Sequence, residues 1–439
     1  MSSPLGRDIF SIAKLQILFA GTGFLTQIFL ARHLGPEQKG LFDLFLLIPT
    51  VLASVIDLGL LSANTYFAGK QKISIHVLHS HSFLWSLVSI VTLCLIFFGV
   101  QSTLQSLFPT LTGTQLFLSL LLAGPLMYFS LWSALMYGVD RVRVVYRFNV
   151  AVSAITLACY VFLAFVLHLN LSALLYATAG LSILKAAVAL FALENTRPWK
   201  FTIDLRALKM SLTYGIALYL GLIINTLHFR VDQFMVNSML GPAELGIYAL
   251  AVRIAEMVWL LDYAIINASI FRVTASSPED AARITQRVAR LLGTMVLISS
   301  ILLSLAAPIF LPLVFGDDFS PAVIPLLLLF PGILAWSLAR VLAQFVAYQS
   351  GKPWLNFKAS AIAFLINIVL VILFIPLWGI AGAAIASSIS YFVNFALLAG
   401  MFKRLSGSTF KSILIPTHED FALLKNFASE QLAVYARKS

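Results

Sequence analysis

Residues 34–42 read Leu-Gly-Pro-Glu-Gln-Lys-Gly-Leu-Phe, and residues 240–248 read Leu-Gly-Pro-Ala-Glu-Leu-Gly-Ile-Tyr. Both stretches share Leu-Gly-Pro-x-x-x-Gly followed by an apolar and an aromatic residue, at an offset of 206 residues. Pro125 and Pro331 are separated by the same offset. The chain is therefore predicted to consist of two repeats. Each Gly-Pro turn is expected to break the helix between adjacent segments, as Gly and Pro do elsewhere.

The composition requires lipid as the solvent for most of this chain. Hydrophobic residues make up 60% of the 439 residues and charged residues 11%, against about 45–50% and 25% in soluble domains. Such a chain could not cover a water-exposed surface with polar groups, which excludes a soluble globule. The apolar runs are continuous rather than alternating, so they predict membrane-spanning helices and not the strands of a barrel.

Twelve apolar runs are long enough to cross a bilayer, which takes about 20 residues per helix. The predicted spans are 11–31, 41–67, 77–99, 115–137, 146–168, 171–193, 211–238, 246–270, 291–314, 322–347, 356–376 and 378–402. Each repeat would hold an even number of spans, so both would start from the same side of the membrane. The predicted fold is an all-α membrane protein with twelve transmembrane helices in two six-helix bundles, related by a parallel internal repeat.

The repeat also predicts the domain boundaries. They are an N-terminal six-helix bundle at 1–196, a cytoplasmic linker at 197–210, a C-terminal six-helix bundle at 211–402 and a cytoplasmic tail at 403–439. Within the tail, Thr417 and Asp420 have the spacing of a capping box. Apolar residues recur after them at helical spacing. We therefore expect an amphipathic helix on the cytoplasmic membrane face.

Lys and Arg residues set the predicted orientation. Of the 29 such residues, four lie inside spans, only Arg32 and Lys39 lie in predicted outer loops, and the others lie in predicted inner segments. Cytoplasmic loops carry an excess of Lys and Arg. The sequence therefore predicts a multi-pass protein of the cell inner (plasma) membrane with both termini in the cytoplasm.

Eight ionisable residues lie inside predicted spans, where each would cost about 2.5–3.5 kcal/mol if it faced lipid at mid-depth. They are Asp57, Lys185, Arg230, Asp232, Arg253, Glu256, Asp262 and Arg340. Together they would cost roughly 20 kcal/mol, which exceeds the net stability of a fold. These residues must face protein or a water-filled cavity.

Lys185 and Arg340 are the most central of the cations. Lys185 lies 12 residues before Arg197 of an inner segment, and Arg340 lies 12 residues before Lys352 of another. At a rise of about 1.5 Å per residue, both lie near the midplane. Because they occupy equivalent depths in the two repeats, they could clamp an anion from both sides. The alternatives are structural pairing across the bundles and snorkelling to the interface.

Two charge pairs lie in the outer half of the membrane. Glu256 follows Arg253 by three residues, so the two share a helix face and can neutralise each other. Asp232 follows Arg230 by two residues, so the two point to nearly opposite faces. One of them could face a cavity while the other ties the helix to a neighbour.

Asp57 and Asp262 fall in the inner half at nearly equivalent repeat positions. Such carboxylates could bind a coupling ion or sense a cytoplasmic gate. The alternative is that both are tied to arginines at the inner helix ends. The candidate residues for ion coupling or gating are therefore the four intramembrane carboxylates Asp57, Asp262, Asp232 and Glu256.

Signatures of enzymes do not stand out in the sequence. We find no Walker motif and no Ser-His-Asp or His-Glu-x-x-His spacing, and we predict neither a catalytic site nor a cofactor. His76, His79 and His81 cluster at the inner end of span 77–99. No Cys or carboxylate joins them, so a polar helix end is expected rather than a metal site.

The chain resembles the polysaccharide-transporter branch of the MOP exporter superfamily, the Wzx-type flippases related to MurJ and the MATE exporters. Three stretches carry the likeness: Leu34–Phe42, Asp232–Tyr248 and Val314–Phe319. The resemblance implies a V-shaped pair of bundles around a cationic cavity, with an undecaprenyl-diphosphate-linked oligosaccharide as cargo. The residues that would fill the cationic role here are Lys185, Arg340, Arg253 and Arg230.

The resemblance implies a flippase that serves O-antigen, capsule or exopolysaccharide synthesis. The candidate partners of such a flippase are membrane lipid, polysaccharide polymerases and glycosyltransferases. Nucleic acid is not expected as a partner. A diphosphate carries about two negative charges and needs Lys or Arg in a low-dielectric cavity. One rival is a MATE-like exporter of cationic small molecules, with a proton or sodium ion on Asp57 or Asp262. The other is a membrane glycosyltransferase, ligase or polymerase, which would need longer outer loops.

Overall fold

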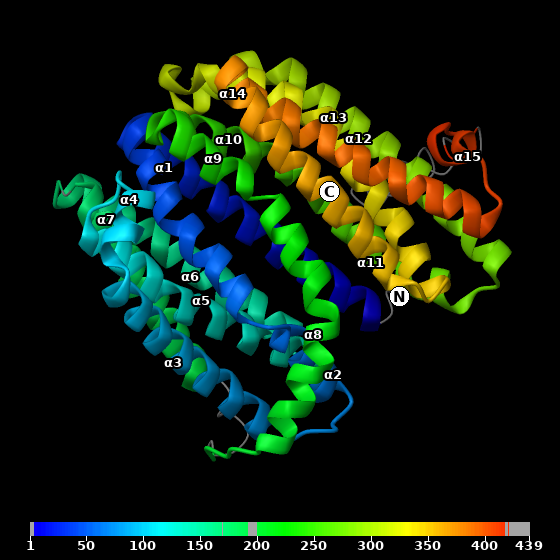
Figure 1. Cartoon of the computed structure of the whole chain (residues 1–439), viewed down its shortest axis with the longest axis horizontal. Coiled ribbons are helices and arrows are strands. Elements are labelled where there is room, and N and C mark those ends of the chain that lie inside the picture. The colour runs from blue at the N-terminus through cyan, green and yellow to red at the C-terminus, as the bar shows by residue number, and fades with distance from the viewer. Residues whose placement is uncertain (1–3, 169, 192–199, 418–419, 421–439) are drawn as a thin grey trace, which may run out of the picture. The chain divides into compact units, whose positions relative to one another are not determined.

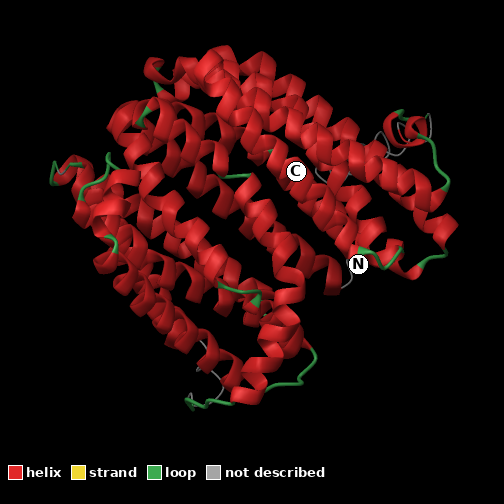
Figure 2. Ribbon diagram, in the orientation of Figure 1, coloured by secondary structure: helices red, strands yellow, loops and turns green. Residues whose placement is uncertain are grey.

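The computed structural model describes residues 4–168, 170–191, 200–417 and 420. Over these residues the chain is built of helices joined by turns and short loops, and it contains no strand (Figures 1 and 2). This confirms the predicted all-α membrane fold. The amphipathic helix expected after Asp420 lies outside the described residues.

The first compact unit comprises Met1–Arg230, Leu240–Gly246 and Val314–Asp318. Its helices are α1 (Pro4–Ile56), α2 (Leu60–Gly69), α3 (Ile75–Gly99), α4 (Gln101–Leu107), α5 (Gly113–Gly138), α6 (Val142–Val161), a π-helical turn (Phe162–Val166), α7 (Leu171–Phe191) and α8 (Leu205–His228). Part of its core is aromatic. Trp132 of α5 is fully buried, and its ring centroid lies 5.5 Å from that of Phe129 and 5.7 Å from that of Phe148.

The second compact unit comprises Val231–Met239, Ile247–Leu313 and Phe319–Ser439. The helices that lie wholly or mostly in it are α9 (Val231–Leu240), α10 (Pro242–Met257), α11 (Trp259–Ala275), α12 (Pro278–Phe315), a 3-10 turn (Asp317–Ala322), α13 (Val323–Gln344), a π-helical turn (Phe345–Gln349), α14 (Pro353–Ser406) and α15 (Phe410–Leu414). Trp259, Trp336 and Tyr391 form an aromatic cluster within this unit, with ring centroids 5.0–6.5 Å apart.

Large apolar side chains project from the outer faces of the helices. Leu95 of α3 is 70% exposed, and Leu305 and Ile309 of α12 are each 73% exposed. Soluble monomers rarely leave extended apolar surface in water. Acyl chains solvate such side chains, so this distribution fits a membrane protein.

Glycines mark the breaks between helical segments. Gly35 within α1 has φ 68° and ψ 176°, and Gly379 within α14 has φ 58° and ψ −138°. Gly241, between α9 and α10, has φ 94°. Glycine is favoured at such positive φ values because it lacks a Cβ. The first copy of the Leu-Gly-Pro motif therefore does break the helix, as predicted, and the second copy breaks it at the matching place.

The number of membrane spans remains a prediction. Among the described residues, eight helices are long and apolar enough to cross a membrane, or nine if a pair bent by 54° (Leu205–Ile216 and Tyr219–Leu240) is one span. The predicted span 246–270 is broken between α10 and α11, which have 16 and 17 residues. Each of these is shorter than the roughly 20 residues that a crossing takes.

Helix α8 belongs to the first compact unit. It packs at the break between α1 and α2, where a Cβ added to Gly59 or to Gly215 would overlap the backbone of the other glycine. The rings of Tyr66 and Tyr214 stack beside this contact at 4.4 Å. The sequence-based boundary at 197–210 separates α8 from the first bundle, and that division stays a prediction.

The predicted topology can be tested with single cysteines. Cysteine introduced at Ser277 should react with a membrane-impermeant thiol reagent only in inverted vesicles, because this loop is rich in Arg. Cysteine at Ala243 should react in intact cells. Labelling of both from the outside would contradict the orientation inferred from the Lys and Arg residues.

Candidate functional site

Lys185 projects from α7 onto an aromatic surface in the first compact unit. Its Nζ lies 3.7 Å from the centroid of the Phe129 ring on α5, and Phe129 stacks on Phe148 at 5.6 Å. Ring faces attract cations, and the attraction increases where water is excluded. The face of the Phe129 ring is therefore the group that contacts the ammonium of Lys185.

Arg340 of α13 pairs with Asp262 of α11 in the second compact unit. The Nη1 atom lies 3.5 Å from Oδ2, with Asp262 fully buried and Arg340 24% exposed. An ion pair with an arginine at an inner helix end is the alternative role that the sequence leaves open for Asp262. Asp262 does pair with an arginine, but Arg340 lies near the predicted midplane and not at a helix end. Lys185 and Arg340 belong to different units, so the two-sided clamp remains a prediction.

Asp232 of α9 lies in a buried hydrogen-bond network. Its Oδ2 accepts hydrogen bonds from the Tyr248 hydroxyl at 2.6 Å and from Ser387 Oγ at 3.0 Å. Asn367 Nδ2 donates to Ser390 Oγ at 3.0 Å and to Ser387 Oγ at 3.4 Å. A buried carboxylate is tolerable when polar groups satisfy it.

Sequence reasoning missed the partners of Asp232 because it considered charged residues only. Asn367 and Ser387 are uncharged polar residues inside the last two predicted spans. Polarity within an apolar run is the signal that could have identified them. Tyr248 closes the second copy of the Leu-Gly-Pro motif, so its place in the motif was known but its role was not.

Arg230, Arg253 and Glu256 are less deeply placed than Asp232. Arg253 is exposed, and Arg230 and Glu256 are partly exposed. Arg230 Nη1 donates to the carbonyl oxygen of Phe229 at 3.2 Å. The predicted pairing of Arg253 with Glu256 stays a prediction.

Asp57 lies at the break between α1 and α2 in the first unit. Its Oδ1 accepts a hydrogen bond from the backbone N–H of Gly59 at 2.6 Å. Close by, the hydroxyl of Tyr219 on α8 donates to the carbonyl oxygen of Val55 at 2.5 Å. Asp57 therefore stabilises the local turn that α8 covers, whatever else it does.

The two copies of the Leu-Gly-Pro motif contact each other through residues 36–40 and 242–246, which lie within the first compact unit. A Cβ on Gly40 would overlap the carbonyl oxygen of Pro242, and a Cβ on Gly246 would overlap that of Pro36. The contact is therefore reciprocal and joins backbone to backbone. Only glycine fits at either position without a shift of the neighbouring chain.

The third stretch of the resemblance reaches the same compact unit. Arg32 Nε donates to the carbonyl oxygen of Val314 at 2.8 Å, and the rings of Phe24 and Phe315 meet edge to face at 5.7 Å. Val314 lies in the last turn of α12, where carbonyl groups lack helical partners. We call these contacts and the glycine pair the motif junction.

The histidine cluster holds the segment that leads into α8. His79 Nε2 lies 2.5 Å from the Tyr128 hydroxyl, and His81 Nε2 accepts a hydrogen bond from the backbone N–H of Asp204 at 3.2 Å. Ser80 Oγ accepts one from the N–H of Thr202 at 3.0 Å. Over the described part of the chain, no three His, Cys, Asp or Glu residues gather in a way that could hold a metal ion.

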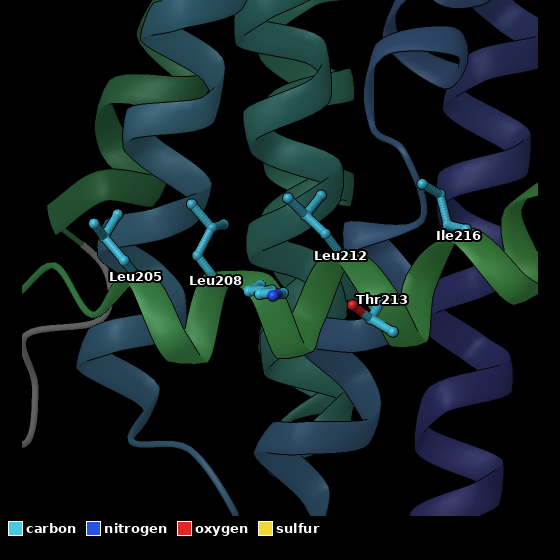
Figure 3. A pocket seen from close by; sticks show the side chains of 6 residues that line it. Leu205, Leu208, Leu212, Thr213 and Ile216 are labelled. Carbon is cyan, nitrogen blue, oxygen red and sulfur yellow. The ribbon is translucent and has the colours of Figure 1, made fainter.

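A pocket of about 420 Å³ lies along α8 (Figure 3). Figure 3 shows Leu205, Leu208, Leu212 and Ile216 projecting from one side of the helix. Lys209 is the one charged residue in its lining, which includes none of the eight intramembrane ionisable residues. The pocket is an apolar groove and not the predicted cationic cavity.

A family model described as polysaccharide biosynthesis protein matches residues 29–324. No curated protein matches the sequence. Among solved structures, the chain is similar to an inward-facing multidrug resistance MATE family transporter of the MOP superfamily. That match has a TM-score of 0.70 and 15% identity and covers 90% of this chain and 96% of that one.

Two further structures show the same fold. One is the lipid II flippase MurJ in an inward closed conformation, with a TM-score of 0.68, 14% identity and coverage of 90% of this chain and 89% of that one. The other is a MOP superfamily transporter from Pyrococcus furiosus, with a TM-score of 0.61, 16% identity and coverage of 91% and 96%. These neighbours are transporters and flippases, not enzymes. Since the family model covers well over half of the chain, the protein belongs to the polysaccharide biosynthesis protein family.

Proposed function

We propose that this protein is a flippase for an undecaprenyl-diphosphate-linked oligosaccharide. It would move the lipid from the cytoplasmic to the outer leaflet of the inner membrane, for O-antigen, capsule or exopolysaccharide synthesis. The observation that carries the proposal is a polysaccharide biosynthesis family sequence on a transporter fold. Alternating access needs no catalytic group, because a difference in affinity between two conformations suffices.

Lys185 is the residue that supports an anionic cargo best. A phosphate oxygen forms a stronger, charge-assisted bond with an ammonium group than an aromatic ring face does. A phosphate could therefore take the place of the Phe129 ring as the partner of the Lys185 ammonium, without displacing a carboxylate. Held against this ring, Lys185 is stabilised without cargo and is still able to bind it.

Arg340 would engage cargo by exchange. Its guanidinium is partly exposed while it contacts the buried Asp262. A diphosphate could replace Asp262 as its partner, since a guanidinium binds carboxylate and phosphate with the same fork of donors. Asp262 would then lose its counter-ion and could take up a proton or sodium ion, which links cargo binding to a coupling ion.

The remaining charged residues are proposed to act around this exchange. Arg230 and Arg253 would extend the cationic surface toward the outer leaflet. Asp232 and Glu256, with Asp57, are the further candidates for ion coupling or gating. The network of Tyr248 and Ser387 supports Asp232 in that role, because it presents several oxygen atoms to one buried site.

The motif junction is proposed to close the outer side of the transport path. Its glycine contact is tight and lacks intervening side chains. Tight packing of this kind is either formed or broken and does not deform gradually. The junction would be intact while cargo loads from the cytoplasm and would part for release.

A MATE-like, cation-coupled exporter of small molecules is the second candidate. The TM-scores for the MATE and MurJ structures are nearly equal, and the buried Asp262 and Asp232 would suit ion coupling. Lys185 argues against it, because an intramembrane ammonium without a bound carboxylate would repel a cationic cargo. The flippase proposal includes polymerases or glycosyltransferases as partners. It also includes a cytoplasmic location for both termini.

Removing the central cations should impair flipping. Lys185→Ala should lower the rate about tenfold or more, because a charge-assisted hydrogen bond contributes roughly 1.5–3 kcal/mol. Lys185→Arg should be milder, since the charge survives. Flipping of a labelled lipid-linked oligosaccharide in proteoliposomes is the measurement, with the exposed Arg283→Ala as control. Normal flipping by Lys185→Ala would show that this lysine is structural.

Arg340 requires a paired design. Arg340→Ala alone leaves Asp262 as an uncompensated buried charge, which costs about 3–5 kcal/mol. Adding Asp262→Asn should restore the protein's thermal stability but not its flipping. If the double variant recovers both, Arg340 and Asp262 serve the fold and not the cargo.

The glycine pair offers a test of the outer closure. Gly40→Ala or Gly246→Ala should expose a cysteine placed at the buried Leu245, and thiol labelling should rise about tenfold. The two effects should be non-additive because both substitutions break one contact. Gly180→Ala is the matched control, since a Cβ there meets nothing within 4 Å. Equal labelling of all three variants would exclude the junction as a closure.

The driving force can be separated from the coupling ion. Moving a dianionic head group outward gains about 2.3 kcal/mol per charge per 100 mV, or roughly 4–5 kcal/mol in all. We expect an inside-negative potential alone to drive flipping, and Asp57→Asn or Asp262→Asn to slow the return of the empty carrier. If both variants flip normally under potential, pH gradient and sodium gradient applied singly, coupling at these two residues is ruled out.

A further inference from the structure

The described part of the tail folds back onto the start of α12 within the second compact unit. Helix α14 ends at Ser406, and Gly407 follows with φ 68°, the left-handed conformation that ends many helices. The short helix α15 comes next and buries Ile413 completely. Gln286 Nε2 of α12 donates to Ser408 Oγ at 2.6 Å.

Arg290 of α12 holds the tail at two points. Its Nη1 donates to the carbonyl oxygen of Ser412 at 2.8 Å. Its Nε and Nη2 donate to Asp420 Oδ2 and Oδ1 at 2.6 and 3.3 Å, a bidentate arrangement. Arg287 adds a longer contact, with its Nε 3.9 Å from Asp420 Oδ1.

Asp420 is enclosed from the tail side as well. Oδ2 accepts hydrogen bonds from Thr417 N and from Thr417 Oγ1, both at 2.8 Å. The bond to the Thr417 N–H is one half of the capping box that the sequence predicts. The result is a carboxylate that is 2% exposed, facing an Arg290 that is 12% exposed.

We propose that residues 408–417 and Asp420 form a clasp, locked by Arg290, that docks the tail on α12 and ties the start of α12 to the end of α14. The clasp goes beyond the proposed transport function and does not depend on it.

Comparison with a neighbouring ion pair shows why this contact can serve as a lock. Arg283 and Asp280 lie on the same helix with their atoms 2.7 Å apart, but they are 75% and 56% exposed. Exposed pairs contribute little to stability, because water and salt screen them. Breaking a buried bidentate pair leaves a charge without compensation and is strongly unfavourable.

The lock is not a pH switch. Burial alone would raise the pKa of the Asp420 carboxyl. The hydrogen bonds from Arg290 and Thr417, with the charge of Arg290, instead lower this pKa to about 2. Because the pKa of Asp420 is lower when the tail is docked, the ionised carboxylate stabilises the docked form at any pH above the ordinary carboxyl pKa. That stabilisation is lost only as the pH falls through about 2. Acidification in the cell therefore does not release the clasp.

Limited trypsin digestion of the purified full chain tests the clasp. Cleavage after Lys411 should be about 10- to 100-fold faster in Arg290→Ala and Asp420→Asn than in the unmodified protein, because digestion follows the population of the undocked tail. Arg283→Ala should match the unmodified protein. Asp420→Asn is nearly isosteric and lies in the tail, so it tests the lock without disturbing the membrane helices.

Spin labels at Glu279→Cys and Arg404→Cys test the tie between α12 and α14. We expect a narrow distance distribution that broadens when Asp420→Asn is added. Equal cleavage after Lys411 in all variants would overturn the clasp, and an unchanged distance distribution would overturn the tie. Neither readout involves transport, so failure here leaves the flippase proposal to its own tests.

Discussion

The exclusion of water from the membrane interior is the constraint on which this structure depends. An ion there loses its hydration, so the protein must supply a partner. The chain meets this need in three different ways. Lys185 lies over the Phe129 ring, Arg340 pairs with Asp262, and Asp232 accepts hydrogen bonds from hydroxyl groups.

These three arrangements differ in how easily a cargo or ion could replace the partner. A ring face gives up a cation readily, whereas an ion pair must exchange one anion for another. The buried carboxylate of Asp232 accepts hydrogen bonds from the hydroxyl groups of Tyr248 and Ser387. In the flippase proposal, the cations bind the cargo and the carboxylates serve ion coupling.

The sequence could predict the fold class because lipid leaves few alternatives. Long apolar runs must become helices, and the repeated Leu-Gly-Pro motif marked where helices break. The span count was harder to predict, because hydropathy does not report a break such as the one between α10 and α11. The contact between the two motif copies could not be inferred at all, since the same residues also serve as ordinary helix-breaking turns.

The site was predictable only in its charged members. Depth and charge identified Lys185, Arg340 and Asp262, but pairing depends on contacts across long stretches of sequence. Arg340 lies 78 residues from Asp262, and Ser387 lies 155 residues from Asp232. Asp420 combines both situations. Its hydrogen bond to Thr417 could be predicted from their local spacing, whereas its pairing with Arg290, 130 residues earlier, could be seen only in the folded structure.

The central claim is that this protein moves a lipid because its head group is an anionic diphosphate. The direct measurement is flipping by the purified protein in proteoliposomes of one oligosaccharide on two isoprenoid carriers, linked through a diphosphate or through an uncharged ether. We expect flipping of the diphosphate-linked lipid only. Equal flipping of both lipids, or transport of an organic cation with neither lipid flipped, would contradict the account.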